Sequence, residues 1–384
     1  MNNSYAKQKT NFFSDPFNYL RVIAMLCVFL LHAKTNSLNH QSSPLSFLLY
    51  TPAWAGVWIF VFLSGYFLFK GFWQERYALT RKGVGKFYVK RVLKLLPTYY
   101  VTFLFAYLLF SVGKPLNTKT VLQFLFLGYN GTGALFTGMG ALWFVSTIFQ
   151  LYLLTPLLAW LLRPLKNKRT LTAIALLFVI VLGLFYRLLS YRLDWDWYRH
   201  TYTAFYANLD IYLGAGLFAL LKHQTGELQN KRFFLSARIL SALSILLLIA
   251  ANSYVYFSQN VDMLFVYRYY LPSVYLLSCG FFAFAFDGIR RVKDQKTRPV
   301  DFLAGVSLEF YMVHSIMLNV CQPLWTTEIM DMPTYVFYLF SIFCISLLIA
   351  WLLKKFVQLL SFGFAKLLGL IKKLRKPKPQ TDTE

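Results

Sequence analysis

The chain has 384 residues, of which 58% are hydrophobic and 14% are charged, against about 45–50% and about 25% in ordinary soluble proteins. This composition excludes a soluble multidomain enzyme, a disordered chain, a collagen-like repeat and a disulfide-stapled secreted domain. The formal net charge of +24 would suit nucleic acid, so the positions of the charges decide what it means.

Long apolar stretches predict an all-α fold, a polytopic membrane helix bundle with about ten transmembrane helices. A helix needs about 20 mostly apolar residues to cross a bilayer. The predicted spans are residues 17–38, 52–72, 95–112, 141–162, 171–190, 202–221, 236–257, 269–287, 300–321 and 334–353. The first span lacks a small-residue cleavage site, so we do not interpret it as a cleaved signal peptide.

The basic residues predict the orientation of the bundle. Most of the 39 Lys and Arg residues lie before the first span, in alternate loops or after the last span. By the positive-inside rule both termini are therefore cytoplasmic, and the charge is a topological signal that gives no support for a nucleic-acid partner. We expect a cytoplasmic segment at 1–16, a membrane domain at 17–353 and a basic tail at 354–384 with a disordered end. Residues 372–378 of that tail are expected to lie against anionic lipid headgroups.

Two other features of the chain need an interpretation. Residues 120–128 are apolar but too short to cross, and residues 129–140 are rich in glycine. A re-entrant or surface-lying segment that covers an internal cavity and an ordinary outer loop are both compatible with this pattern. The cysteines (Cys27, Cys279, Cys321 and Cys344) lie singly in apolar runs. This spacing predicts small core residues and no metal site.

Ionisable groups inside a span are energetically costly, which makes each a candidate for function. Arg21 and His32 are eleven residues apart, so they lie on one helical face with an axial separation of about 16 Å. His314 lies as far into its span as His32 does into the first, and both spans are predicted to run outward. Two imidazoles at one depth could flank one reacting centre as general base and partner. The alternatives are a snorkelling arginine and two unrelated packing histidines.

A cluster of positive charges precedes the third span. Lys90, Arg91 and Lys94 lie on roughly one helical face just inside the predicted membrane boundary, in a segment that ends at Pro97. Such a cluster can bind the phosphates of a soluble cofactor. The alternative is the positive-inside rule itself.

Three more polar residues, Gln150, Asp210 and Glu309, lie in or near spans. We expect them to be hydrogen-bond partners inside the bundle and not catalytic groups. No HExxH, GxSxG or P-loop pattern occurs, so a zinc protease, a serine hydrolase and an NTP-driven pump lack support.

Five motifs follow one another across nearly the whole chain, namely NYLRVIAMLCVFLLHAK, WIFVFLSGYFLFKG, FYVKRVLKLLPTYY, ALWFVSTIFQLYLLTPLL and GVSLEFYMVHSIML. In these motifs and their order the sequence resembles the acyltransferase-3 family of multi-pass membrane acyltransferases. The family's basic segment is usually Arg-x-x-Arg, whereas this chain has Arg91-x-x-Lys94. A lysine offers a point charge and not a planar fork, which weakens the case for bidentate phosphate binding at this position.

The resemblance implies transfer of an acyl group, most simply acetyl, from cytoplasmic acyl-CoA to a hydroxyl of a surface glycan or lipid-linked sugar. It implies a multi-pass protein of a bacterial plasma membrane, with acyl-CoA as the donor substrate and no metal. Arg21 and His32 match residues regarded as essential in the family. His314 would bind the acceptor or stabilise the imidazolium. Ser64 and Gly65 match the family's Ser-Gly motif, where the small pair permits close helix approach and a nucleophilic Ser64 is the weaker option.

Three alternatives stay open at this stage. Direct base catalysis by His32 and an acyl-histidine intermediate are both compatible with the sequence. A glycan transporter or flippase would use the histidines without forming a bond, and the broken segment at 129–140 favours it slightly. A non-catalytic scaffold would leave Arg21, His32 and His314 without a purpose. The outer residues Trp195, Trp197, Tyr198, Asp194 and Asp196 are candidate sugar contacts, although an interfacial aromatic belt is the favoured explanation for them.

Overall fold

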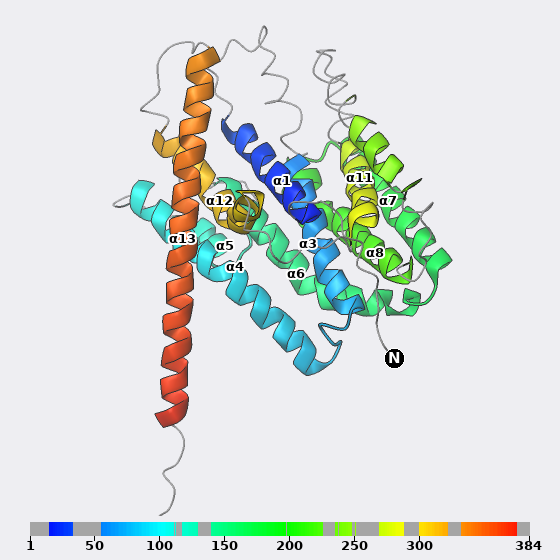
Figure 1. Ribbon diagram of the computed structural model, residues 1–384, viewed down its shortest axis with the longest axis horizontal. Helices are drawn as coiled ribbons and strands as arrows, with labels where there is room; N and C mark the ends of the chain where they lie inside the picture. The colour runs from blue at the N-terminus through cyan, green and yellow to red at the C-terminus, as the bar shows by residue number, and fades with distance from the viewer. Residues whose placement is uncertain are drawn as a thin grey trace, which may run out of the picture.

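The computed structural model consists of helices and the loops between them, with no strand in the part of the chain that it describes (Figure 1). The described residues are 15–33, 55–110, 112, 117–129, 140–196, 198–225, 235–236, 238–247, 250, 269–287, 299–321 and 332–374. The helices are α1 (Pro16–Ala33), α3 (Ala55–Trp73), α4 (Arg81–Phe110), α5 (Thr118–Leu125), α6 (Trp143–Leu162), α7 (Arg169–Arg192), α8 (Leu209–Thr225), α11 (Leu271–Phe286), α12 (Pro299–Cys321) and α13 (Met332–Leu374). Single turns of 3₁₀-helix (Gly140–Leu142, Arg163–Leu165 and Tyr206–Asn208) and a π-helical turn (Tyr198–Thr203) link some of them.

The predicted all-α membrane bundle is confirmed. Seven of the described helices are long and apolar enough to cross a bilayer. Three other predicted spans fall on shorter apolar helices, namely Arg238–Leu247, Leu271–Phe286 and Leu209–Thr225. The protein is therefore a multi-pass membrane protein, and its orientation remains the prediction from the Lys and Arg residues.

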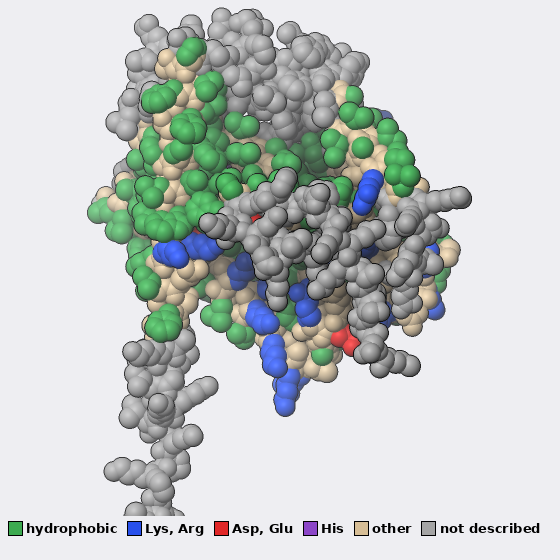
Figure 2. Space-filling view, viewed as in Figure 1, with side chains coloured by type: hydrophobic (Ala, Val, Ile, Leu, Met, Phe, Trp, Pro, Cys, Tyr) green, Lys and Arg blue, Asp and Glu red, His purple; other side chains and the backbone are tan. Residues whose placement is uncertain are grey.

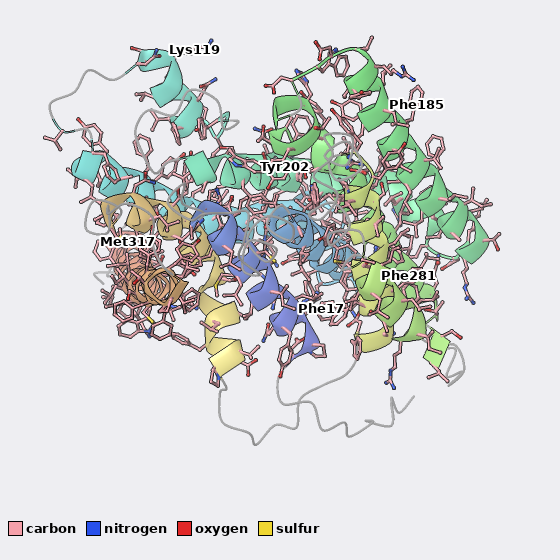
Figure 3. The ribbon with its side chains drawn as sticks, turned by 90° about the horizontal axis from the view of Figure 1, so that it is seen from above. Phe17, Lys119, Phe185, Tyr202, Phe281 and Met317 are labelled. Atoms are coloured by element: carbon pink, nitrogen blue, oxygen red, sulfur yellow. The ribbon has the colours of Figure 1, made fainter. Side chains whose placement is uncertain are left out.

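Helix α3 lies at the centre of the bundle because it is apolar on all sides. It packs against α8, α1, α11 and α6. Beyond α1, helices α12 and α13 form the other side of the bundle, and α7 covers α8. Figure 3 shows this order from above, with Met317 of α12 beside α13 and Phe185 of α7 at the opposite side.

Two boundaries differ from the sequence-based prediction. Helix α4 begins at Arg81 and not at Leu95, and it continues through Pro97. The basic segment is therefore part of one continuous helix and does not end at Pro97. Helix α13 continues past residue 353 to Leu374, so the proposed domain boundary does not coincide with a break in the helix. Helix α13 extends beyond the other helices at one end of the bundle (Figure 1).

The short segment after α4 is a surface-lying helix with anchored carbonyl groups. The Tyr99 hydroxyl donates to the carbonyl of Phe124 at 3.1 Å, and Tyr100 donates to Leu125 at 2.7 Å. The Gln150 amide donates to the carbonyl of Leu127 at 2.9 Å. These donors satisfy carbonyl groups at the C-terminal end of α5 that lack partners within the helix. Residues 130–139, and with them the predicted cover over a cavity, lie outside the described residues.

Candidate active site

The structure brings the two predicted histidines into contact. His32 is next to the last residue of α1, and His314 lies in the middle of α12. The Nδ1 atom of His32 lies 3.0 Å from Nε2 of His314, and the ring centroids are 5.0 Å apart. The sequence-based expectation that the two imidazoles lie at one depth therefore agrees with the geometry, although their catalytic roles stay predictions.

The neighbouring carbonyl groups determine which nitrogens carry protons when both rings are neutral. Nδ1 of His314 lies 2.7 Å from the carbonyl oxygen of Tyr311, which only accepts, so this nitrogen donates and Nε2 accepts. Nδ1 of His32 faces the carbonyl oxygen of Val28 at 2.9 Å and the accepting nitrogen of His314, so it too carries a proton. The lone pair of His32 is then on Nε2.

The two rings differ in accessibility. His314 is completely buried, whereas His32 is exposed. His314 therefore faces His32 and backbone carbonyls, and His32 is the member of the pair that a substrate can approach. A buried polar group without a hydrogen-bond partner is unfavourable. Both nitrogens of His314 have a partner, Nδ1 in a backbone carbonyl and Nε2 in His32.

An aromatic cluster below the histidines explains why α1 and α12 face each other at this point. Phe29 lies one turn before His32, and Phe310 lies one turn before His314. Their ring centroids are 5.8 Å apart, and both also contact Phe343 of α13. The ring of Phe310 is nearly parallel to that of His314, with an interplanar angle of 4°. Packing of these apolar rings fixes the rotation of both helices, and with it the histidine pair.

Arg21 lies near the opposite end of α1 from His32. Its guanidinium donates to the side-chain oxygen of Asn18 at 2.5 Å, and the Asn18 amide donates to Asp301 of α12 at 2.9 Å. The guanidinium also lies 5.1 Å from the ring centroid of Phe67. Arg21 is thus held in a fixed network and does not contact His32. The sequence analysis did not identify Asn18 or Asp301, although the i, i+3 spacing of Asn18 and Arg21 was a usable signal.

The positive charges of α4 gather with Arg21 on the same side of the bundle. Lys94 interacts electrostatically with Arg91, Arg21 and Lys354 and with the carboxyl group of Glu309, and Asp15 interacts electrostatically with Arg21. Lys354 also donates to the carbonyl of Gly305 at 2.5 Å. We call Arg21, Arg91, Lys94 and Lys354 the inner cationic group. Figure 2 shows Lys and Arg side chains following α4 toward its lower end, below a mostly hydrophobic surface.

The predicted Lys90 lies apart from this group. Its ammonium lies 5.5 Å from the ring centroid of Tyr77, and the Tyr77 hydroxyl is 3.5 Å from the guanidinium of Arg91. Tyr77 therefore separates Lys90 from the inner cationic group. Ordinary pattern searches do not single out this tyrosine, because it comes from the preceding loop.

Ser64 and Gly65 lie at the contact between α3 and α8. A Cβ atom on Gly65 would collide with the carbonyl oxygen of Tyr212 and approach Cβ of Ala215 to 3.2 Å. The Ser64 side chain lies beside that of Tyr152. These contacts support close helix approach as the purpose of the Ser-Gly pair and place Ser64 in a packing contact.

The other polar residues have structural partners. Asp210 accepts two hydrogen bonds from Arg187, at 2.7 and 2.8 Å, and Gln150 supports the end of α5. Arg187 is buried in α7 as the partner of Asp210, so its charge is neutralised inside the bundle. A partly buried pair joins Lys70 to Asp287, which also accepts from Tyr66 at 2.7 Å.

The described part of the chain holds no group of three or more His, Cys, Asp or Glu residues able to bind a metal. All four cysteines are free thiols. The prediction that they are core residues is wrong for Cys344, which is exposed on α13. Of the candidate sugar contacts, Trp195 is exposed and its ring lies 5.3 Å from that of His200. The side chains of Trp197 and Tyr198 lie outside the described residues.

Comparison with known protein families identifies the family to which this chain belongs. A family model for the acyltransferase domain matches residues 16–353, which include α1, α12 and both histidines. The chain belongs to the acyltransferase-3 family. No curated protein and no solved structure gives a match.

Family membership makes the protein a membrane acyltransferase and removes the main support for a transporter or a scaffold. The matched region ends at residue 353, within α13. The acyltransferase domain therefore includes the histidine pair, the Ser-Gly contact and three members of the inner cationic group, whereas Lys354 follows directly after it.

Proposed function

We propose that this acyltransferase moves an acyl group, most simply acetyl, from acyl-CoA to a hydroxyl group of a cell-surface glycan or lipid-linked sugar, with His32 as the general base. The observation that carries the proposal is the pair of hydrogen-bonded histidines in which Nε2 of the exposed ring is left as the accepting atom. The choice of acceptor and a location in a bacterial plasma membrane rest on the family resemblance.

The inner cationic group supports acyl-CoA as the donor. Its four positive charges outnumber the carboxylates of Glu309 and Asp15 that face them, and this excess suits a diphosphate, which binds best to charge-assisted donors. Arg21 and His32 are separated by about 16 Å along α1. A diphosphate near Arg21 would let the extended pantetheine arm run along the helix and bring its thioester toward His32. Lys94 provides charge at this site, and Arg91 provides the planar fork.

The reaction follows from the proton positions. Nε2 of His32 removes the proton of the acceptor hydroxyl as its oxygen attacks the thioester carbonyl carbon. The carbon–sulfur bond then breaks, and the CoA thiolate takes the proton back from His32. While His32 is charged, the hydrogen bond from its Nδ1 to Nε2 of His314 strengthens, so His314 stabilises the imidazolium. General base catalysis of this kind contributes about 10²–10⁴-fold to a rate.

Purified protein in proteoliposomes, supplied with radiolabelled acetyl-CoA and a glycan acceptor, tests the proposal. We expect label to appear in the acceptor, and we expect His32→Ala to abolish the transfer while the protein still inserts. Full activity of that variant would exclude His32 as the base. Accumulation of label on His32 itself would replace direct transfer by an acyl-histidine intermediate.

The donor site has its own test. Arg91→Ala and Lys94→Ala should raise KM for acetyl-CoA more than they lower kcat, because both residues contact the donor away from the reacting bond. Arg81, exposed at the start of the same helix, supplies the control variant Arg81→Ala, which should leave KM unchanged. An unchanged KM in the Arg91 and Lys94 variants would move the donor site elsewhere. Mass spectrometry of surface glycans from cells with and without the protein identifies the acceptor by the added mass of one acyl group.

A further inference from the structure

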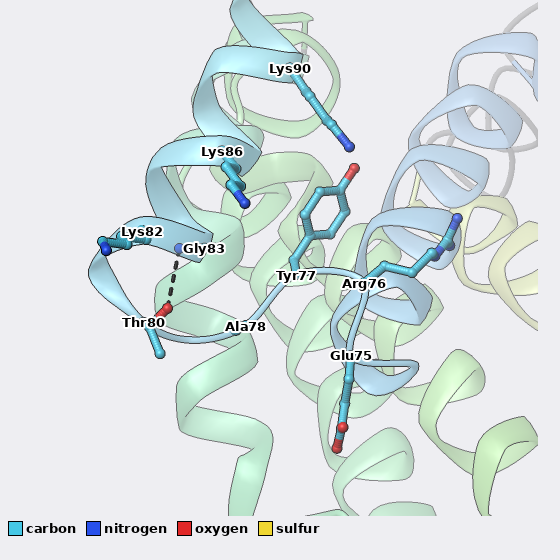
Figure 4. Close-up of a pocket in the computed structure, with 9 residues that line it drawn as sticks. All are labelled: Glu75, Arg76, Tyr77, Ala78, Thr80, Lys82, Gly83, Lys86 and Lys90. Carbon is cyan, nitrogen blue, oxygen red and sulfur yellow. Dashed lines mark hydrogen bonds between the residues drawn. The ribbon is translucent and has the colours of Figure 1, made fainter.

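A second cationic site lies at the beginning of α4, outside the residues assigned to the donor. A hollow of about 250 Å³ is lined by Arg76, Lys82, Lys86 and Lys90 together with Glu75, Tyr77, Ala78, Thr80 and Gly83 (Figure 4). We call it the loop pocket. Lys86 and Lys90 lie in the second and third turns of α4, and in Figure 4 both ammonium groups point toward Tyr77, whereas Lys82 points away. This volume is below the range of about 300–1,000 Å³ for sites that enclose a whole ligand, so the pocket suits one end of a larger molecule.

The loop that forms the pocket is held against the first turn of α4. The backbone N–H of Gly83 donates to the hydroxyl oxygen of Thr80 at 3.2 Å. A Cβ atom on Gly83 would collide with the backbone of Ala78. The backbone N–H of Tyr77 donates to the carbonyl of Gly71 at 3.2 Å. These contacts fix the conformation of the loop and therefore the positions of the positively charged residues around the pocket.

The one acidic residue that lines the pocket, Glu75, is paired with a lysine outside it. The Glu75 carboxylate accepts a hydrogen bond from Lys166 at 2.8 Å, and this ammonium group lowers the pKa of Glu75. Among the described residues, no carboxylate forms an ion pair with Arg76, Lys82, Lys86 or Lys90. The pocket therefore keeps an excess of positive charge, which suits a phosphate monoester with close to two negative charges.

The order of sites along α4 relates the loop pocket to the donor. Lys86 and Lys94 are eight residues apart, which corresponds to about 12 Å along the helix. The diphosphate of acyl-CoA is bonded directly to the pantetheine arm and therefore belongs at the inner cationic group, which lies nearer to the histidines. The ribose and its 3′-phosphate lie on the other side of the diphosphate. Tyr77 stands between the two sites, with Lys90 over its ring and Arg91 at its hydroxyl.

The geometry points to the loop pocket as the site of the 3′-phosphate of acyl-CoA, bound by Lys86 and Lys90, whose ammonium groups both face Tyr77 (Figure 4). This assignment rests on the proposed donor. It makes the enzyme selective for a donor that carries the 3′-phosphate, a feature far from the reacting thioester. Arg76 and Lys86 were not among the residues predicted from the sequence.

The test compares acetyl-CoA with acetyl-dephospho-CoA, which lacks only the 3′-phosphate. A hydrogen bond between charged groups corresponds to about a tenfold effect or more on binding. We expect the wild type to have a KM about tenfold higher for the dephospho donor. Lys86→Ala should raise KM for acetyl-CoA about tenfold and leave KM for the dephospho donor unchanged. Lys168→Ala, at an exposed lysine on the same side of the bundle but outside the pocket, should change neither value.

Other outcomes would overturn the assignment. Equal KM values for both donors in the wild type, or an equal rise for both donors in Lys86→Ala, would show that the pocket does not read the 3′-phosphate. A lipid phosphate is the other source of the same chemistry. If Lys86→Ala altered activity only in vesicles of phosphatidylglycerol and not in those of phosphatidylcholine, the pocket would bind a lipid headgroup instead.

A binding measurement keeps this inference separate from the proposed function. Adenosine 3′,5′-bisphosphate should bind to the purified wild-type protein in calorimetry and should bind about tenfold more weakly to Lys86→Ala. If neither CoA donor supports transfer, the proposed donor is wrong whatever the bisphosphate does. If acetyl-CoA supports transfer but the bisphosphate binds equally well to both proteins, only the assignment of the loop pocket fails.

Discussion

Replacing His314 by phenylalanine tests whether His32 is the base and His314 only stabilises its charged form. The variant His314→Phe keeps a ring of similar size in a fully buried position next to Phe310 and removes the acceptor at 3.0 Å from Nδ1 of His32. His32 keeps the carbonyl of Val28 at 2.9 Å, so its proton stays on Nδ1 and Nε2 remains the base. The change therefore removes one hydrogen bond to the imidazolium and leaves the base in place.

The size of the effect follows from that single bond. A hydrogen bond to a charged group contributes about 1.5–3 kcal/mol, and about 1.4 kcal/mol corresponds to a tenfold change in rate. We expect kcat to fall by about 10- to 150-fold, with KM for the donor unchanged, because the imidazolium forms only during the reaction. This loss is smaller than the loss of about 10²–10⁴-fold expected when the base itself is removed.

Initial rates with radiolabelled acetyl-CoA in proteoliposomes give both constants. His200→Phe is the control, since His200 lies in the turn before α8, away from both α1 and α12. A kcat equal to that of the wild type would show that His314 does not act on His32. A loss as large as that of His32→Ala would instead make His314 the base and refute the proton positions derived above.

Three further outcomes are expected. Arg187→Leu should destabilise the protein by about 3–5 kcal/mol, because it leaves the Asp210 carboxylate buried without a partner, and a second change of Asp210→Leu should restore most of the melting temperature in detergent. Gly65→Ala should lower thermal stability by about 1–3 kcal/mol through the collision with Tyr212, whereas a normal melting curve would mean that α3 and α8 are not in close contact. Lys94→Arg should retain KM for acetyl-CoA within a few-fold and Lys94→Glu should raise it strongly, so equal KM values for the two variants would remove charge as the reason for this residue.

The sequence was sufficient for the bundle and for the histidine pair. Both can be predicted from position along the chain alone. Hydropathy predicts the spans, and a rise of 1.5 Å per residue gives the depth of each polar group within its span. The direction of the rings was out of reach, because it depends on how Phe29 and Phe310 rotate the two helices against each other. The proton positions were equally out of reach, since they depend on which carbonyl each nitrogen faces.

Other features that the sequence did not predict depend in the same way on contacts between helices. Arg187 lies near the end of a predicted span, where hydropathy cannot separate a solvated arginine from one paired with a carboxylate 23 residues later. The length of α13 was missed because the apolar pattern weakens after residue 353, although no proline follows before Pro377 and helix-favouring residues continue. The loop pocket was missed because Tyr77 and Arg76 meet the lysines of α4 only when the loop folds back.

The histidine pair also has a consequence for energy coupling. Nδ1 of His314 reaches only the backbone carbonyls of Phe310 and Tyr311, neither of which can pass a proton on. Among the described residues, the relay through His314 therefore ends inside α12. In the proposed reaction the proton that leaves the alcohol returns through His32 to the departing thiolate, so the reaction takes up and releases no net proton. The rate should then be indifferent to the membrane potential and to a pH gradient of the kind that drives many transporters.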